Sequence, residues 1–311
     1  MESHTMFRHL VRPRAALGVL LLVGAAGQSP AFAQEVNQQG ALVANWGPSN
    51  VIDLDGSWVP AQTEDVSNDP VSPVEYMGIP LNEAARTRAQ SYNDLQLSTN
   101  EHQCEGFGAT YILTGPFGLK ISANYDVLKG DLVSYTMPAW EDKVGLVIWM
   151  DGRPHPSPNA EHTRGGFTTG RWENGELVAV TTHMQQAFIR KNGPPLSDAA
   201  KMTLRFKRRE NRLLVIGIIE DPIYLAEPMV WTRDYVLSTR PLLGSTVPCL
   251  FAYEGAPFTH DVPHYLWGNK PFQDELVKKF GIPQDAVLGY PETLYPEYRL
   301  KMQQTKAAGG K

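Results

Sequence analysis

Apolar and polar residues alternate strictly along residues 201–207, which predicts a strand with one buried face. Successive side chains of a strand point to opposite faces, so a period of two separates a core side from a solvent side. The residues on the apolar side of this strand are Met202, Leu204 and Phe206. The next run, 213–219, has almost no polar side, and we expect it to lie centrally in a sheet. The charged residues 208–212 predict an exposed turn between the two strands.

Short apolar runs bounded by turn residues continue along most of the chain. Further strands are predicted at 110–113, 118–125, 132–137, 144–150, 229–237 and 249–254. Several short strands at close intervals are typical of a β-sandwich or an up-and-down barrel. The expected fold class is therefore mainly β, with an antiparallel barrel as its main part.

The clearest local signal is a hairpin between the runs 167–172 and 176–182. Glu173, Asn174 and Gly175 separate these two runs. Asn-Gly tolerates the positive φ angles of a tight hairpin turn, so the two runs should pair as antiparallel strands. A loop with three prolines and two histidines leads into this hairpin. We expect this loop and the two strands to carry the functional site.

Helical patterns occur near both ends of the expected barrel. Asn82 can cap a helix that runs to about Tyr92, and a second helix is predicted at 273–280, stopped by Gly281. The expected organisation is a flexible segment 34–50, a barrel-like domain 51–271 and a C-terminal appendage 272–311 whose end, from 303, is disordered.

The N-terminus has the pattern of a secretory signal peptide. Arg8, Arg12 and Arg14 precede the apolar segment 15–26, and Ala31-Phe32-Ala33 follows it, which predicts cleavage after residue 33. A membrane anchor is the alternative, but it needs about 20 apolar residues. We therefore expect residues 1–33 to be removed, no membrane span in the mature chain, and a periplasmic or secreted location.

Composition narrows the class of partner. The chain is 42% hydrophobic and 20% charged, with a net charge of −5, so we expect no nucleic acid partner. Cys104 and Cys249 are the two cysteines, and an oxidising compartment favours a disulfide between them. Such a crosslink would stabilise the fold by roughly 5 kcal/mol in the chain-entropy model. Two separate buried thiols are the alternative.

Ordered motifs make the chain similar to a large, mostly uncharacterised family of exported bacterial proteins. The motifs are Asp151-Gly152-Arg153-Pro154-His155-Pro156, Gly170-Arg171-Trp172-Glu173 followed by Leu177-Val178, and Asp221-Pro222 followed by Tyr224. The resemblance implies no activity. Members of that family often carry His at the position of Phe167, where this chain departs from the pattern. Separately, Gly56-Ser57-Trp58 resembles the first-strand signature of lipocalin barrels, which implies that Trp58 closes one barrel end.

Histidines are the main candidates for chemistry. His155 and His162 lie on the loop before the hairpin, His183 follows the hairpin, and His264 lies further along the chain. Imidazole can act as a general acid or base near neutral pH, and it can also bind metals. No H-x-H, HExxH or Cys-His spacing is present, so a metal-dependent site is the less favoured interpretation. The leading interpretation includes no metal and no other cofactor.

The remaining site candidates come from the same region. Arg171 would neutralise negative charge that develops on a substrate. The predicted ligand-contacting residues are Trp149, Trp172, Phe167, His155 and His264. Aromatic residues in such runs are more often core residues, although an eight-stranded barrel can hold one small ligand inside.

The leading hypothesis is an exported, lipocalin-like barrel that binds a small apolar or aromatic molecule. It would act as a cofactor-independent lyase, isomerase or hydrolase, with His162 and His183 as acid–base residues. The first alternative is a carrier without catalytic activity, in which the histidines are dispersed. The second is an enzyme whose metal is bound by three histidines. Short distances among the imidazoles favour the enzymes over the carrier.

Overall fold

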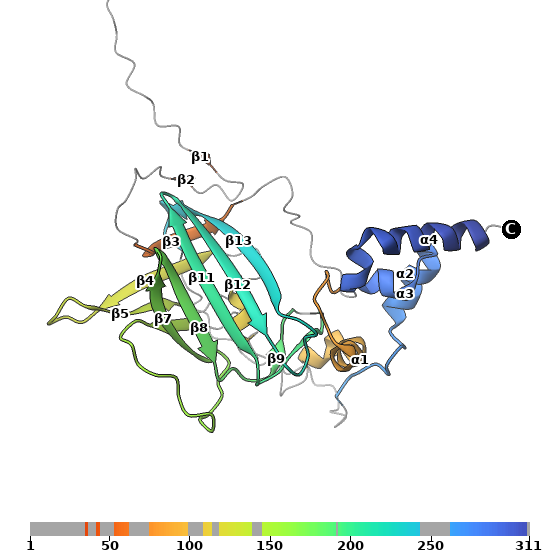
Figure 1. Cartoon of the computed structure of the whole chain (residues 1–311), viewed down its shortest axis with the longest axis horizontal. Helices are drawn as coiled ribbons and strands as arrows, with labels where there is room; N and C mark the ends of the chain where they lie inside the picture. The colour runs from red at the N-terminus through yellow and green to blue at the C-terminus, as the bar shows by residue number, and fades with distance from the viewer. Residues whose placement is uncertain are drawn as a thin grey trace, which may run out of the picture. The chain divides into compact units, whose positions relative to one another are not determined.

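The computed structural model describes residues 35–36, 42–43, 53–61, 75–98, 108–113, 118–138, 145–190, 192–242 and 262–309. Within these residues, nine strands form a closed barrel in the order β3-β4-β5-β6-β7-β8-β11-β12-β13, and β13 pairs with β3 (Figure 1). Their bounds are β3 Gly56–Pro60, β4 Leu119–Tyr125, β5 Leu132–Met137, β6 Leu146–Trp149, β7 Phe167–Glu173, β8 Glu176–Thr182, β11 Lys201–Arg209, β12 Arg212–Glu220 and β13 Met229–Ser238. The prediction of a mainly β fold with a barrel is confirmed.

One pair of strands corrects the expectation of a purely antiparallel barrel. β6 and β7 are parallel, with Ile148 opposite Thr168 and Trp149 opposite Thr169, whereas every other neighbouring pair of barrel strands is antiparallel. A parallel pair needs a long connection that returns the chain to the starting end of the first strand. Residues 150–166 form this connection, which we call the crossover. The barrel is therefore mixed, and its one parallel step creates the loop that carries His155 and His162.

The inner face of the barrel is closely packed. The inward residues that are at most 3% exposed are Trp58, Leu119, Ile121, Tyr135, Leu146, Ile148, Leu177, Ala179, Met202, Leu204, Phe206, Leu213, Val215 and Tyr235. Trp172, on the inner side of β7 near the hairpin turn, is 39% exposed. Trp58 also donates a hydrogen bond from Nε1 to the Leu54 carbonyl oxygen at 3.0 Å, which satisfies its one polar atom. Side chains that border a water-filled cavity would be more exposed, so these residues fill the space between them.

The β7–β8 hairpin has the predicted turn. Asn174 and Gly175 have φ angles of 49° and 81°, the positive values that a primed turn requires. Register then pairs Glu173 with Glu176 at the turn and Phe167 with Thr182 at the open end. The turn thereby decides which residues of the two strands face each other at the end where the crossover arrives.

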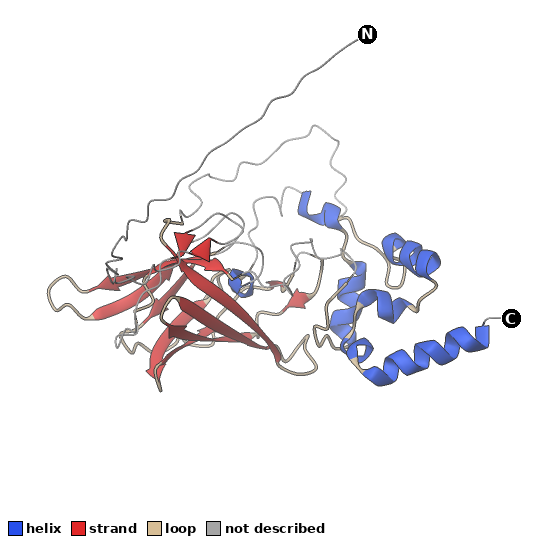
Figure 2. Ribbon diagram, turned by 90° about the horizontal axis from the view of Figure 1, so that it is seen from above, coloured by secondary structure: helices blue, strands red, loops and turns tan. Residues whose placement is uncertain are grey.

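Helices occur in two parts of the chain, between β3 and β4 and after β13, and Figure 2 draws them in blue. They are α1 Glu83–Ser91, α2 Pro271–Phe280, α3 Gln284–Leu288 and α4 Pro296–Gly309, with short 3₁₀ helices η1 Asp94–Ser98, η2 Ala109–Leu113 and η3 Pro291–Leu294. As predicted, Asn82 caps α1 by accepting a hydrogen bond from the Ala85 amide at 3.0 Å. Gly281 ends α2 with a φ of 60°.

Several sequence expectations differ from the fold. The predicted strand at 110–113 is the 3₁₀ helix η2. Helix α4 continues through residues 303–309, where disorder was expected. In the segment 34–50, which was expected to be flexible, β1 Glu35–Val36 pairs with β2 Leu42–Val43. Outside the barrel, β9 Ala187–Phe188 and β10 Pro195–Leu196 form a separate two-stranded sheet. The signal peptide, the predicted strand at 249–254 and both cysteines lie outside the described residues.

Candidate functional site

The crossover lies against the outer face of the barrel, by which we mean the face of β6, β7 and β8 turned away from the core. Thr168 and Thr181 point inward, are buried, and share a hydrogen bond of 2.8 Å. A Cβ added to Gly170 would lie 2.6 Å from Ile148 Cγ2 and 3.1 Å from Leu177 Cδ1, so Gly170 also faces the core. Because side chains alternate along a strand, Thr169 and Thr182 project from the outer face.

His155 of the crossover binds both of these outer threonines. Its Nδ1 lies 2.8 Å from Thr182 Oγ1, and its Nε2 lies 2.8 Å from Thr169 Oγ1. The edge of its ring also packs on Phe167, with 5.6 Å between the ring centroids. His155 therefore joins the crossover to β7 and β8 at once, outside the barrel rather than in its interior.

His183 reaches the same place through an unusual backbone conformation. It follows Thr182 directly, so regular strand alternation would place it on the opposite face. Its φ of 57° breaks the alternation, a conformation that histidine adopts more readily than most residues, at a cost of about 1–3 kcal/mol. The ring then lies with Nδ1 2.8 Å from Thr182 Oγ1 and Nε2 2.9 Å from the Ser157 carbonyl oxygen.

His162 completes a group of three imidazoles. The Thr163 amide donates a hydrogen bond to the His183 carbonyl oxygen at 2.9 Å, which fixes this part of the crossover beside the end of β8. The His162 and His183 ring centroids are 5.2 Å apart. His162 Nδ1 donates a hydrogen bond to the Met184 carbonyl oxygen at 2.9 Å. Among the described residues its Nε2 has no hydrogen-bond partner, so the neutral ring keeps a lone pair available there.

The hydrogen bonds of His155 and His183 form one directed chain. A carbonyl oxygen only accepts, so His183 Nε2 donates to Ser157 and, in the neutral ring, Nδ1 accepts from the Thr182 hydroxyl. Thr182 Oγ1 then accepts from His155 Nδ1, and His155 Nε2 accepts from the Thr169 hydroxyl. We call this chain of four side chains the relay. A proton added to His183 would reverse its direction as far as Thr169.

Burial affects the protonation of the relay. Desolvation of the half-buried ring, and then the nearby charge of His183, lower the pKa of His155. The neutral form that the relay requires of His155 is therefore favoured.

A second contact fixes the beginning of the crossover. The Arg153 guanidinium stacks on the Trp149 ring, 3.6 Å from its centroid, and its Nε donates to Asp151 Oδ1 at 2.9 Å. Trp149 lies on the outer face because its neighbour Ile148 is in the core. Stacking and ion pairing together fix Arg153, two residues before His155. The Trp149 ring stays half-buried on the same outer face as the imidazoles.

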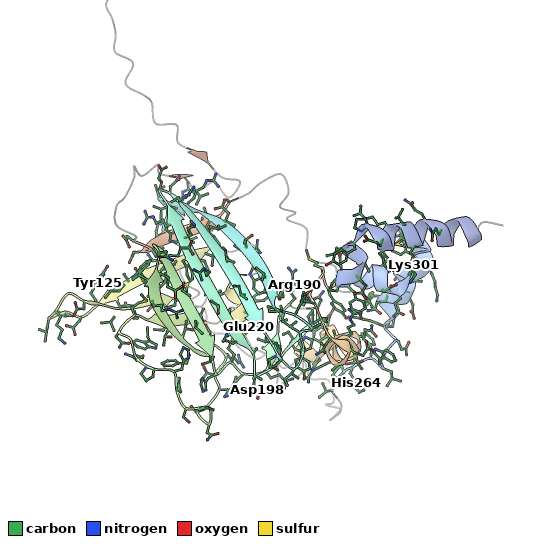
Figure 3. All side chains as sticks on the ribbon, in the orientation of Figure 1. Tyr125, Arg190, Asp198, Glu220, His264 and Lys301 are labelled. Atoms are coloured by element: carbon green, nitrogen blue, oxygen red, sulfur yellow. The ribbon has the colours of Figure 1, made fainter. Side chains whose placement is uncertain are left out.

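Three of the residues predicted for the site lie elsewhere. Arg171 is largely exposed and donates to Glu173 Oε1 at 2.6 Å. Trp172 projects from the inner side of β7 near the hairpin turn and packs edge-on against Tyr135. His264 pairs with Tyr92 next to α1 (Figure 3), where its Nδ1 donates to the Val262 carbonyl oxygen. The predicted residues that come together are His155, His162, His183, Phe167 and Trp149.

Thr169 and Thr182 were missed by sequence reasoning. Both belong to Thr-Thr pairs, 168–169 and 181–182. In the observed register Thr168 lies opposite Thr181, with Thr169 and Thr182 on either side of this pair. Alternation sends one threonine of each pair inward and the other outward. This repeated pair is the signal that would have identified them.

No group of three or more His, Cys, Asp or Glu side chains in the described ranges is arranged to hold a metal ion. No helix in the described part of the chain has the length and apolar character of a membrane span.

Comparison with family models, with curated proteins and with solved structures gives no match for this chain.

Proposed function

We propose that this chain is an exported acid–base enzyme whose site lies on the outer face of the barrel. The observation that carries the proposal is the convergence of three imidazoles. Two belong to the relay, and the third, His162, has an Nε2 lone pair without a partner among the described residues. An imidazole nitrogen that can accept a proton, beside a hydrogen-bonded chain of hydroxyl and imidazole groups, is what proton transfer requires.

The site offers a base and an acid on one face. His162 Nε2 would take a proton from the substrate. The Thr169 hydroxyl would return one. In the neutral relay Thr169 donates to His155, so Thr169 would be reprotonated after a proton added to His183 has reversed the relay. Elimination and isomerisation both need this pair of proton transfers, so a lyase or isomerase is the leading reaction class, followed by a hydrolase that activates water.

Aromatic side chains beside the imidazoles suggest the substrate class. Trp149 and Phe167 are half-buried on the outer face, and each keeps part of a ring accessible. A small aromatic or otherwise planar molecule would stack there with its reacting atom near His162. The close packing of the inner face supports this location over the interior site of a carrier. We also propose that the chain is a member of the uncharacterised exported family that its motifs resemble.

A substrate panel assayed across pH tests the proposal. Residues 34–311 would be incubated with small aromatic β-hydroxy acids, enolisable ketones, lactones and esters between pH 5 and 9, with product detected by mass spectrometry. We expect turnover of at least one class, falling on acidification because a protonated imidazole cannot act as a base. Turnover that ignores pH, or no turnover of any class, would contradict the proposal.

A further inference from the structure

A group of buried polar side chains, built from residues outside the relay, lies at the beginning of helix α2. Lys270 occupies the N-cap position of α2, and Gln273 is the third residue of the helix. Positions three apart are neighbours on a helix, so these two side chains lie on one side of its first turn. Lys270 Nζ lies 6.0 Å from the centroid of the Tyr76 ring, which adds a third polar side chain from before α1. Lys270 is 3% exposed, and the other two are fully buried.

Each of these three side chains has a hydrogen-bond donor that is not used. Among the described residues, Lys270 Nζ, Gln273 Nε2 and the Tyr76 hydroxyl have no partner. The Gln273 oxygen, Oε1, accepts from Gln284 Nε2 at 3.0 Å, so this amide is held on its accepting side alone. Buried polar groups in proteins nearly always have a partner. Three neighbouring donors without an acceptor therefore indicate that the acceptor is a bound molecule.

Lys270 indicates the charge of that molecule. A buried ammonium group is costly unless an opposite charge lies beside it. Burial lowers the pKa of Lys270, and Asp94 counteracts this in part. Asp94 is exposed, however, and it is not hydrogen-bonded to Lys270 Nζ. A bound anion would supply the missing negative charge.

The N-terminus of α2 favours an anion at the same place, but a weakly charged one. No side chain caps this end of the helix, and the helix dipole places partial positive charge there. Asp274 already lies in the first turn, and with Asp94 it repels further negative charge. A carboxylate with one negative charge suits this group better than a phosphate with up to two.

We propose that Lys270, Gln273 and Tyr76 bind the carboxylate group of a small organic acid. The ammonium group would contact one carboxylate oxygen, and the amide and the hydroxyl would donate to the remaining lone pairs. The buried rings of Tyr76 and Tyr290 lie 5.9 Å apart, so the surroundings are aromatic and favour an aromatic acid. No histidine belongs to this site, so its failure and the failure of the acid–base site are independent.

Isothermal titration calorimetry with benzoate tests this proposal. Residues 34–311, which form one compact unit, would be titrated at pH 7 with benzoate, benzamide and inorganic phosphate in separate experiments. We expect benzoate to bind, and to raise the temperature of thermal unfolding because it binds the folded chain. Benzamide has the same ring without the charge and should bind at least about ten-fold more weakly, since charged hydrogen bonds contribute more than neutral ones. Phosphate should also bind more weakly than benzoate.

Three substitutions remove the proposed contacts one at a time. Lys270→Met should weaken benzoate binding at least about ten-fold, and it removes a buried charge, so the variant without benzoate should be no less stable. Gln273→Glu keeps an oxygen for Gln284 and places a carboxylate beside Lys270, which should lower the affinity for benzoate by at least about ten-fold. Tyr76→Phe removes one neutral donor and should lower the affinity about five-fold.

Lys278→Met is the matched control, because Lys278 is an exposed lysine of the same helix. It should leave the affinity for benzoate within about two-fold, as exposed charges contribute little. The proposal would be overturned by any of four results: no benzoate binding, equal binding of benzamide, tighter binding of phosphate, or equal losses in Lys270→Met and Lys278→Met. If Lys270→Met does not fold, an unchanged benzoate affinity in Gln273→Glu would overturn the proposal instead.

Discussion

Replacing His162 by alanine is expected to lower turnover by at least about 100-fold on whichever substrate the panel identifies. His162 Nε2 is the one imidazole nitrogen of the three-histidine group without a partner among the described residues. General acid–base catalysis by a positioned side chain contributes roughly 100-fold to 10,000-fold. The measurement is kcat and kcat/KM of His162→Ala, together with its thermal unfolding, to separate lost chemistry from lost structure.

His264→Ala is the matched control for this prediction. His264 is exposed and lies beside Tyr92, away from the relay, so its removal should leave kcat within about two-fold. His162→Gln should be as inactive as His162→Ala, because an amide can still donate to the Met184 carbonyl but cannot accept a proton at neutral pH. Equal activities of His162→Ala and His264→Ala would remove His162 from the mechanism.

Replacing Asp221 by alanine is expected to lower the free energy of unfolding by about 3–5 kcal/mol. This carboxylate is 3% exposed and follows β12 directly. It accepts hydrogen bonds from the amides of Ile223 and Tyr224, and from both the amide and the hydroxyl of Ser197 at 2.7 and 2.6 Å. Alanine would leave several buried donors without an acceptor, each at a cost of about 1–3 kcal/mol, partly relieved by water.

Chemical denaturation measures this loss. Asp198→Ala is the control, since Asp198 is an exposed carboxylate one residue beyond Ser197, and its removal should change stability by less than about 0.5 kcal/mol. Asp221→Asn should fall between the two, because an amide keeps one accepting oxygen. A loss below about 1 kcal/mol for Asp221→Ala would show that the Ser197 segment is held by other contacts.

Local patterns were sufficient to predict most of the strands. The alternation of Met202, Leu204 and Phe206 places these side chains in the core as expected, and Asn174-Gly175 determines the register of β7 and β8. The prediction of a strand at 110–113 was wrong. The run is short, and tertiary contacts override its β-rich composition. There the Ala109 amide donates to the Arg164 carbonyl oxygen of the crossover, a partner 55 residues away that local pattern does not reveal.

The parallel step was not predictable for a related reason. The direction of β7 beside β6 depends on where a long connection docks, and only the folded crossover shows this. The proximity of three histidines was anticipated, because the hairpin register brings the end of β8 to the start of β7. The sequence did not predict that the histidines lie on the outer face of the barrel. Leu177, Val178, Ala179 and Val180 are apolar on both sides of β8, so the period of two does not tell which side is the core.

Nitrogen NMR of the histidine rings tests the central claim, which is that His155 is held between Thr169 and Thr182 and connected through Thr182 to His183. Spectra of residues 34–311 labelled with ¹⁵N would be assigned with single histidine variants. At pH 8 the relay predicts one tautomer for His155, protonated at Nδ1, and the opposite tautomer for His183, protonated at Nε2. The pKa of His155 should lie below the ordinary value of about 6.5. Averaged tautomers for both rings, or an ordinary pKa for His155, would contradict the account.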